Sequence, residues 1–329
     1  DGGHPLGGPP VPPVGARGGG GTVEGGPRRR DDPRRVGAHD LVRALGDGDR
    51  ALGLLAQRQA RDPEDGRLLL HPAGVGQHEP GVGLEGPDGG PGAPAEPKNW
   101  RTRCSMLVKT PAGTLLIDTS PDLRMQLLRT ATGRIDAVLC THDHADQIHG
   151  IDDLRAVAYA NRRRMPVYAD GPTMATLRQR FGYCFETPAG SLYPPILDAR
   201  LIEDPLRPFA VQAAHGTVEV VPFAQTHGRI RSLGFRIGPI AYSSDVSALD
   251  DAAFAALEGV ECWIVDALRD EPHPTHSHVA QTLEWISRVR PRRAILTNLH
   301  IDLDYAALSA RLPPGVEAAY DGLSFASAL

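Results

Sequence analysis

From residue 98 onward, apolar and polar positions follow two alternating patterns. Short runs rich in apolar residues alternate with longer stretches in which apolar side chains recur every three or four positions. The short runs predict strands at 105–109, 114–119, 136–140, 165–169, 218–225, 233–238, 240–245, 262–268, 293–299 and 316–320. The longer stretches predict helices at 121–130, 151–163, 173–181, 247–257, 278–289 and 305–312. The proline-rich segment 184–205 is predicted to be irregular. This alternation indicates an α/β protein with two sheets and helices outside them.

The first 97 residues have a different composition. They contain no Phe, Tyr, Trp, Ile, Met, Cys, Ser, Asn or Lys, while Gly, Pro, Arg, Ala, Asp and Leu dominate. Such a segment cannot offset a backbone ordering cost of about 1–2 kcal/mol per residue, so we predict that it is disordered. Residues 39–60 place leucines along one side of a helix, but glycines interrupt it. We therefore divide the chain into a low-complexity segment, 1–97, and a folded domain, 98–329.

The origin of the segment 1–97 has two interpretations. Its residue set is the one that GC-rich codons encode, and the chain starts with Asp rather than Met. We expect an out-of-frame or over-extended translation fused to a real gene. A genuine low-complexity extension is the alternative.

Charge and cysteine content narrow the class of protein. The net charge of the 329 residues is -5, which gives no sign of a nucleic-acid-binding surface, so nucleic acid is not an expected partner. No apolar run reaches the roughly 20 residues of a membrane span, and the N-terminus lacks the apolar core of a signal peptide. We expect a soluble cytoplasmic protein without a membrane partner. The four cysteines have no CxxC spacing and are expected to be buried apolar residues.

Histidine and carboxylate side chains gather where predicted strands end. They are His142, His144, Asp146, His227, Asp245 and His300. Four separate strands each deliver such a group at the carboxyl end, where α/β folds place their chemistry. Neutral imidazole and carboxylate are ligands for Zn²⁺, Mn²⁺ or Fe²⁺. Structural roles for the whole set would leave too many buried polar groups without partners, so we predict a metal site.

The order of these motifs resembles a known superfamily. The stretch THDHADQ, 141–147, resembles the HxHxDH signature of the metallo-β-lactamase superfamily, and QTHG, SSD and TNLHID follow in the order of its remaining ligands. Further segments, such as LLIDTSPDLRMQLL and IVDALR, most resemble the branch of cyclic-phosphate phosphodiesterases of phosphonate breakdown. The resemblance implies an αββα sandwich with a binuclear metal centre between the sheets. That family also begins with a strand and a Gly-rich loop. Neither is recognisable here, so we expect one sheet to lack its first strand.

The resemblance also implies a role for each ligand. His142, His144 and His227 match the first metal site, Asp146 and His300 match the second, and Asp245 matches the bridging carboxylate. His215 competes with His227 for its role, but it precedes its strand, which favours His227.

Gln147 stands where the family usually has histidine. A neutral amide oxygen is a poorer metal donor than imidazole, so we expect two divalent ions, zinc first and Mn²⁺ or Fe²⁺ as alternatives, with the second site weakened. The alternative is that Gln147 only hydrogen-bonds a metal-bound water and the enzyme works with one ion.

The implied activity is hydrolysis of a small or cyclic phosphate ester by a metal-bound hydroxide, with Asp146 orienting the nucleophile. His276 and His278 in HPTHSH are candidates to protonate the leaving group, with helix capping as the alternative. Asp266 is a candidate to support a metal-bound histidine. Arg101 and Arg103 are candidates to bind phosphate, against plain solvent exposure. A lactone, thioester or β-lactam hydrolase and an inactive metal-binding protein are the alternative functions. The sequence leaves a homodimer open.

Overall fold

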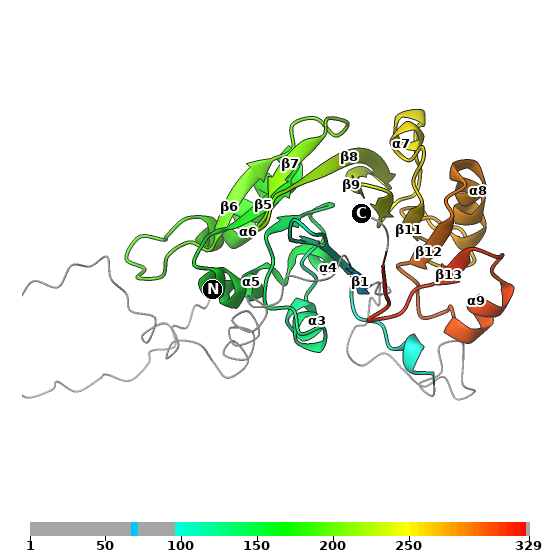
Figure 1. The fold of residues 1–329 in the computed structure, drawn as a ribbon, viewed down its shortest axis with the longest axis horizontal. Coiled ribbons are helices and arrows are strands. Elements are labelled where there is room, and N and C mark those ends of the chain that lie inside the picture. Colours follow the sequence, from blue (N-terminus) through cyan, green and yellow to red (C-terminus); the bar gives the residue numbers. More distant parts are fainter. Residues whose placement is uncertain (1–66, 72–95, 327–329) are drawn as a thin grey trace, which may run out of the picture. The chain divides into compact units, whose positions relative to one another are not determined.

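Two sheets form the described part of the protein. The computed structural model describes residues 96–326 and, by their backbone, residues 67–71, and all of these fall in one compact unit, Leu45–Leu329 (Figure 1). Each sheet contains seven strands. The α/β class with two sheets, predicted from the alternating periods, is therefore confirmed.

The first sheet has the strand order β14-β1-β2-β3-β4-β5-β6. Its strands are β1 (Arg67–His71), β2 (Ser105–Lys109), β3 (Thr114–Ile117), β4 (Ala137–Leu139), β5 (Met165–Ala169), β6 (Leu197–Leu201) and β14 (Ser324–Ala326). The pairs from β14 to β3 are antiparallel, and those from β3 to β6 are parallel. The carboxyl ends of the parallel strands β3 and β4 therefore lie at the same end of this sheet.

The second sheet has the order β13-β12-β11-β10-β9-β8-β7. Its strands are β7 (Phe209–Gln212), β8 (Thr217–His227), β9 (Ile230–Ile237), β10 (Ile240–Ser243), β11 (Cys262–Asp266), β12 (Arg293–Thr297) and β13 (Val316–Ala318). Strands β7 to β10 are antiparallel neighbours, whereas β10 to β13 run parallel. The long strand β8 ends at His227, so a candidate ligand stands at its carboxyl end.

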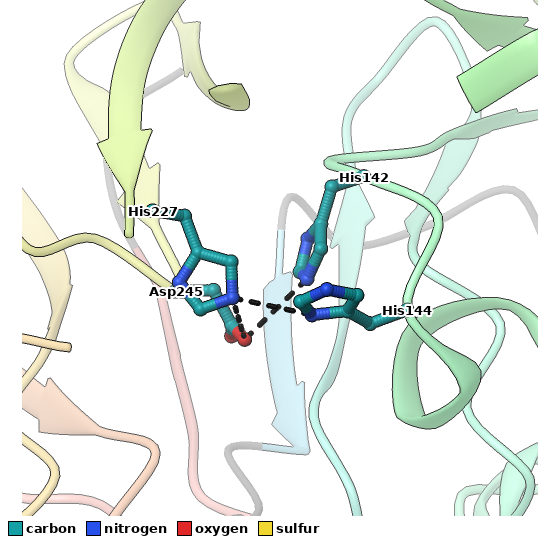
Figure 2. Close-up of side chains that lie close together, drawn as sticks. All are labelled: His142, His144, His227 and Asp245. Carbon is teal, nitrogen blue, oxygen red and sulfur yellow. Dashed lines mark hydrogen bonds and ion pairs between the residues drawn. The ribbon is translucent and has the colours of Figure 1, made fainter. Parts of the chain in front are cut away.

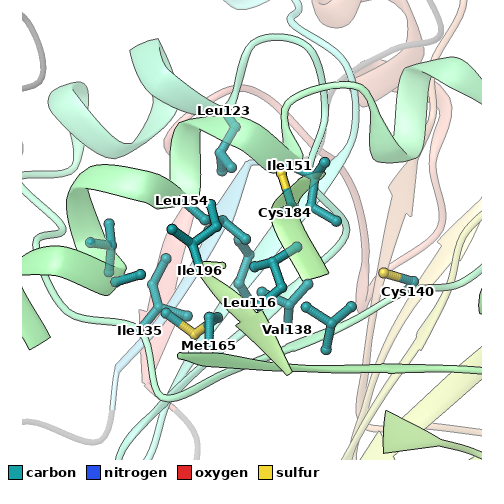
Figure 3. Close-up of a cluster of buried hydrophobic side chains, with 14 of the residues drawn as sticks. Leu116, Leu123, Ile135, Val138, Cys140, Ile151, Leu154, Met165, Cys184 and Ile196 are labelled. Atoms are coloured by element: carbon teal, nitrogen blue, oxygen red, sulfur yellow. The ribbon is translucent and has the colours of Figure 1, made fainter. Parts of the chain in front are cut away.

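Three hydrophobic clusters define the layers. One cluster joins the facing sides of both sheets, with Ile117 and Leu139 from the first and Phe235 and Ile264 from the second. The other two pack helices onto the outer faces, as Figure 3 shows for the first sheet. The helices are α3 (Leu123–Arg129), α4 (Ala145–Ile148), α5 (Leu154–Asn161), α6 (Gly171–Phe185), α7 (Asp251–Ala256), α8 (Val279–Val289) and α9 (Tyr305–Arg311), with short 3-10 turns at Pro97–Asn99 and Ile151–Asp153. The layer order is helix, sheet, sheet, helix, which confirms the predicted αββα sandwich.

Aspartate caps mark where three of these helices begin. The carboxylates of Asp170, Asp250 and Asp304 accept the backbone N–H of the residue three positions later, at the starts of α6, α7 and α9. Such a bond satisfies one of the amide donors that have no partner within the helix.

Four short strands were not predicted. Strand β6 lies within the Pro-rich stretch 184–205 and β7 follows it, and both lie at sheet edges. Their exposed positions weaken the apolar pattern: β6 has two exposed residues and β7 has two among its four. The prediction that 184–205 is irregular is therefore wrong for Leu197–Leu201. Strand β14, at the opposite edge, is only three residues long.

Strand β1 corrects the expectation that the first sheet lacks its first strand. Residues Arg67–His71 lie between β14 and β2, with Leu68 opposite Val108 and Leu70 opposite Met106. The strand comes from within the segment 1–97, where composition favoured disorder. Its local sequence, RLLLH, is short and apolar, but it stands among glycines and prolines that hid it. The rest of that segment up to residue 95, including the helix considered at 39–60, lies outside the described residues.

The prediction for the cysteines is confirmed. All four cysteines are unpaired and buried, as predicted. Among the residues that the structure describes, no helix has the length and apolar character of a bilayer span.

Candidate metal centre

Three imidazoles and one carboxylate converge between the two sheets. One ligand atom each from His142, His144, His227 and Asp245 lies within 4.8 Å of all the others (Figure 2). The three rings are arranged edge to face, with centroids 4.6 to 5.0 Å apart. His142, His227 and Asp245 are buried, and His144 is exposed. The structure thus brings together the three histidines predicted for the first metal site and the predicted bridging carboxylate.

His142 is oriented by a buried network that begins at the end of β3. The carboxylate of Asp118 accepts both the backbone N–H and the hydroxyl of Thr141, each at 2.8 Å. Because the hydroxyl proton is directed at Asp118, its oxygen is left to accept from Nδ1 of His142, 2.9 Å away. The His142 Nε2 atom then carries a lone pair, is buried and has no hydrogen-bond partner.

His227 is oriented from the other sheet. Its Nδ1 lies 2.6 Å from the carbonyl oxygen of Thr275, which can only accept, so Nδ1 carries the proton. Its Nε2 lone pair therefore faces the cluster, 3.2 Å from Nδ1 of His144 and 3.6 Å from Oδ2 of Asp245. Carbonyl support of this kind fixes the tautomer of a metal-binding histidine.

The charges of the cluster suit a divalent cation. Burial lowers the pKa of His142 to about 3, so this imidazole is neutral at neutral pH. Burial opposes ionisation of Asp245, but the nearby His142, His276 and His227 outweigh it and lower the pKa of the carboxyl to about 2. A carboxylate and imidazole lone pairs without hydrogen donors are what a cation such as Zn²⁺ binds. The residues present therefore fit one divalent ion, and the partnerless Nε2 of His142 is the clearest sign of it.

Asp146 and Gln147 lie beside this cluster on α4. The side-chain amide nitrogen of Gln147 is 3.4 Å from Oδ2 of Asp146 and 3.4 Å from Oδ1 of Asp245. Gln147 is fully buried, whereas Asp146 is partly accessible. Both residues thus contact the group, although neither is one of its four convergent ligands.

His276 lies next to His227, with 4.8 Å between the two ring centroids. Its Nδ1 lies 2.8 Å from Oδ2 of Asp266, and its Nε2 is 3.9 Å from Oδ2 of Asp245. Burial lowers the pKa of His276, but the charge and hydrogen bond of Asp266 more than offset this and raise it to about 9. Asp266 was predicted to support a metal-bound histidine, and the structure pairs it with His276. His278 is the N-cap residue of α8, but its side chain makes no capping hydrogen bond.

The structure does not bring His300 into the cluster. Its Nδ1 lies 2.8 Å from Oδ2 of Asp302, and its side chain is 31% exposed. Asn298, two residues earlier, is the residue after β12 that reaches Asp245, with 3.1 Å between Nδ2 and Oδ1. His215 is exposed at the opposite end of β8 and lies outside the cluster, as expected from its position.

The two arginines considered for phosphate have partners within the chain. Arg101 donates to the carbonyl oxygens of His300 and Leu303 at 3.0 and 2.8 Å, and burial lowers its pKa to about 10. Arg103 pairs with Asp122 at 3.2 Å. Arg101 therefore holds the loop after β12 in place.

Asp118, Thr141, Thr275 and Asn298 were missed in the sequence. The first three orient ligands through hydroxyl, carboxylate or carbonyl groups, which a search for ligand-type side chains passes over. Asn298 stands in the same TNLHID motif as His300. Its position directly after a predicted buried strand is the feature of the sequence that points to Asn298.

Comparison with known proteins gives the same class as the site. Residues 114–301 match the beta-lactamase superfamily domain, which is more than half of the chain, and the protein belongs to that superfamily. Together with the His and Asp cluster, this makes it a metal-dependent hydrolase of the metallo-β-lactamase fold. The resemblance seen in the sequence is confirmed.

Individual relatives differ in what their names describe. A diphosphatase from the PhnP family has a similar structure, with a TM-score of 0.69 and 29% identity over 79% of this chain and 96% of that one. Zn²⁺-bound PqqB from Methylobacterium extorquens shares the fold, with a TM-score of 0.60 and 17% identity over 79% and 99% of the chains.

A curated relative carries a different name. An octanoyltransferase of Porphyromonas gingivalis is 35% identical over 228 residues, 68% of this chain and 44% of that protein. The chain thus spans less than half the length of that relative.

Proposed function

We propose that the protein is a phosphodiesterase that hydrolyses a small or cyclic phosphate ester. The observation that carries this proposal is the His276–Asp266 pair beside the ligand cluster. Because Nδ1 of His276 is hydrogen-bonded to Asp266, the other ring nitrogen, Nε2, faces Asp245. Nε2 can therefore donate a proton to a substrate oxygen bound beside the ligand cluster. The diphosphatase with 29% identity, whose name describes phosphate chemistry, supports the same substrate class.

A divalent ion held by the cluster, with zinc the first candidate, would supply an activated water and positive charge for the phosphate oxygens. The chain itself orients the reactants. Asp146 is partly accessible beside the cluster, so its carboxylate can accept a hydrogen bond from the attacking water. Asp245 and the fixed tautomers of His142 and His227 direct lone pairs toward one point.

His276 acts on the leaving group. The P–O bond that breaks leaves an alkoxide, which needs a proton near neutral pH. The proton moves from Nε2 of His276 to that oxygen, and the charge of Asp266 helps to restore the imidazolium from solvent. His278 has no carboxylate in this role, so we assign the proton transfer to His276 alone.

A carbonyl hydrolase is the second candidate. The octanoyltransferase name of the 35% identical relative describes acyl transfer, and the same cluster can serve attack on a lactone or thioester. A metal-binding protein without activity is the third, and metal-dependent turnover would exclude it.

The leaving group gives the sharpest test. Purified protein is assayed with bis-p-nitrophenyl phosphate, a cyclic nucleotide and a lactone, with and without chelator. Nitrophenolate can leave without being protonated, whereas the alkoxide formed from a cyclic nucleotide needs a proton to leave. His276→Gln should therefore slow cyclic-nucleotide hydrolysis by about 100-fold or more and affect the nitrophenyl ester far less.

His215→Gln, which removes an exposed histidine far from the cluster, is the control and should match wild type. Turnover of the lactone with neither phosphodiester hydrolysed would contradict the proposal in favour of the carbonyl hydrolase.

A further inference from the structure

We infer that the centre binds one metal ion, because the amide groups of Gln147 and Asn298 fill the place where a second ion would lie. The inference concerns the ligand cluster alone and does not depend on the substrate. It replaces the weakened second site expected from Gln147 in the sequence with a closed one.

The two oxygens of Asp245 have different surroundings. Oδ1 receives the hydroxyl of Ser244 at 2.7 Å, the amide of Asn298 at 3.1 Å and the amide of Gln147 at 3.4 Å. Oδ2 faces imidazole nitrogens, with His142 Nε2 at 3.5 Å and His227 Nε2 at 3.6 Å. A carboxylate oxygen offers about two lone pairs, so three donors saturate Oδ1. Only Oδ2 is left for a metal, so Asp245 cannot bind one ion through each of its two oxygens.

Gln147 lies between two carboxylates. Its Nε2 is 3.4 Å from both Asp146 Oδ2 and Asp245 Oδ1. Carboxylates only accept hydrogen bonds, so the NH₂ end of the amide must face them rather than the oxygen. A cation shared by Asp146 and Asp245 would occupy the same space. The two N–H groups therefore take over part of the charge compensation that a second ion would give.

The side-chain amide of Asn298 is oriented like that of Gln147, with its NH₂ group toward Asp245. Its Oδ1 lies 3.3 Å from the thiol of Cys104, which donates to it, so Nδ2 is the end that meets Asp245. The residue has a φ of 62°, in the left-handed region that asparagine tolerates better than most side chains. Rotating the amide to offer its oxygen to a metal would break both contacts at once.

The groups left over do not make a second site. Asp146 supplies one carboxylate, and the buried Oε1 of Gln147, which has no hydrogen-bond partner, supplies one neutral oxygen. His300 is paired with Asp302. Nε2 of His276 lies 3.9 Å from Oδ2 of Asp245 and its ring lies 4.8 Å from that of His227, so it faces the oxygen of the first site and not Oδ1, where the two amides lie. The first site by contrast has three imidazoles and a carboxylate.

The test measures how many metal ions each protein chain retains. Wild type and variants are saturated with Mn²⁺ or Zn²⁺, passed through a desalting column and analysed for metal per chain by mass spectrometry. Wild type should retain one ion. Gln147→His alone should also retain one, because Ser244 and Asn298 still occupy Oδ1. The double variant Gln147→His/Asn298→His should retain two.

The matched control is Gln147→Leu/Asn298→Leu, which removes both amides without adding a ligand and should keep one ion. Two retained ions in wild type would overturn the inference. A folded histidine double variant that retains one ion would overturn the role given to the amides.

A spectroscopic measurement covers a double variant that fails to fold. Wild-type protein loaded with Mn²⁺ should give the electron paramagnetic resonance spectrum of isolated ions, and the spectrum of a coupled pair would refute the single-ion centre. Neither readout needs turnover, so failure here is distinct from failure of the phosphodiesterase proposal.

Discussion

Three histidines of the site differ in protonation because a different group contacts Nδ1 in each. His142 has a threonine hydroxyl at 2.9 Å and His227 a carbonyl at 2.6 Å, and each keeps a lone pair directed at the cluster. His276 has a carboxylate at 2.8 Å instead, which raises its pKa to about 9, whereas burial lowers that of His142 to about 3. At this site the neutral neighbours thus leave a free lone pair on the imidazole, and the ionised neighbour favours the protonated ring.

The His276–Asp266 pair predicts a pH-dependent stability. The folded pKa of His276, about 9, is above its ordinary value of 6.5, so its contribution is complete below about 6.5 and is lost as pH rises through about 9. In protein treated with chelator, His276→Gln should lower the free energy of unfolding at pH 6 by on the order of 3 kcal/mol more than at pH 10. Urea denaturation at both pH values measures this difference.

The matched variant Asp266→Asn removes the partner and keeps the imidazole. It should remove most of the same pH dependence, because Asp266 raises the pKa of His276 more than Asp245 and Asp146 do. A destabilisation by His276→Gln that is equal at both pH values would show that the pair stores no such linkage.

Single residues set a limit on what the sequence could predict. His142, His144, His227 and Asp245 were found because ligand-type side chains directly follow strands. Which of Asn298 and His300 reaches Asp245 could not be predicted in this way. It depends on the left-handed turn at Asn298 and on Arg101 holding the loop that follows, both of which are tertiary features.

At the scale of elements, the site is built from strand ends with one shared backbone conformation. Asp118, Asp245 and Asn298 have φ of 60°, 55° and 62°, and they follow β3, β10 and β12 within two residues. Aspartate and asparagine adopt this left-handed conformation more readily than other residues with side chains. The same residue type therefore turns the chain and supplies the polar group that the site needs.

Most strands and helices could be predicted because they are buried on one face or both. Strand β11 is buried at every position and was found as a continuous apolar run. The short β14 and the partly exposed β6 lie at edges, where pairing to a neighbour rather than apolar pattern decides the structure. Strand β1 has the apolar pattern but stands in an unfavourable composition, which led the prediction astray.

The position of β1 predicts an asymmetric effect of two deletions. Removing residues 1–62 leaves β1 intact, whereas removing 1–95 takes away its pairing with both β2 and β14. The longer deletion should lower the unfolding midpoint by about 5 °C or more relative to the shorter one, because buried backbone donors and acceptors of β2 lose their partners. Circular dichroism during heating measures both midpoints. Equal midpoints would mean that β1 does not stabilise the sheet.

At the scale of the whole molecule, the cluster joins the two sheets. His142 and His144 follow β4 of the first sheet, whereas His227 and Asp245 come from β8 and β10 of the second. Two sheets with helices outside were predictable because strand and helix periods alternate along the chain, and the convergence was predictable because four strands each end in a ligand-type side chain. The sandwich itself and the role of each ligand came from the resemblance.

This arrangement predicts that metal binding stabilises the molecule as a unit. An ion that binds only the folded state at 100 times its dissociation constant adds about 2.7 kcal/mol, which for a domain of this size raises the midpoint by several degrees. His227→Ala removes one of four ligands and should lose most of the rise when Zn²⁺ is added to chelator-treated protein. His300→Ala should keep the full rise, because His300 is paired with Asp302 outside the cluster. Differential scanning calorimetry with and without Zn²⁺ compares the two variants at matched protein concentration. If His300→Ala lost the rise as well, His300 would reach the ion in solution and the ligand set would have to include it.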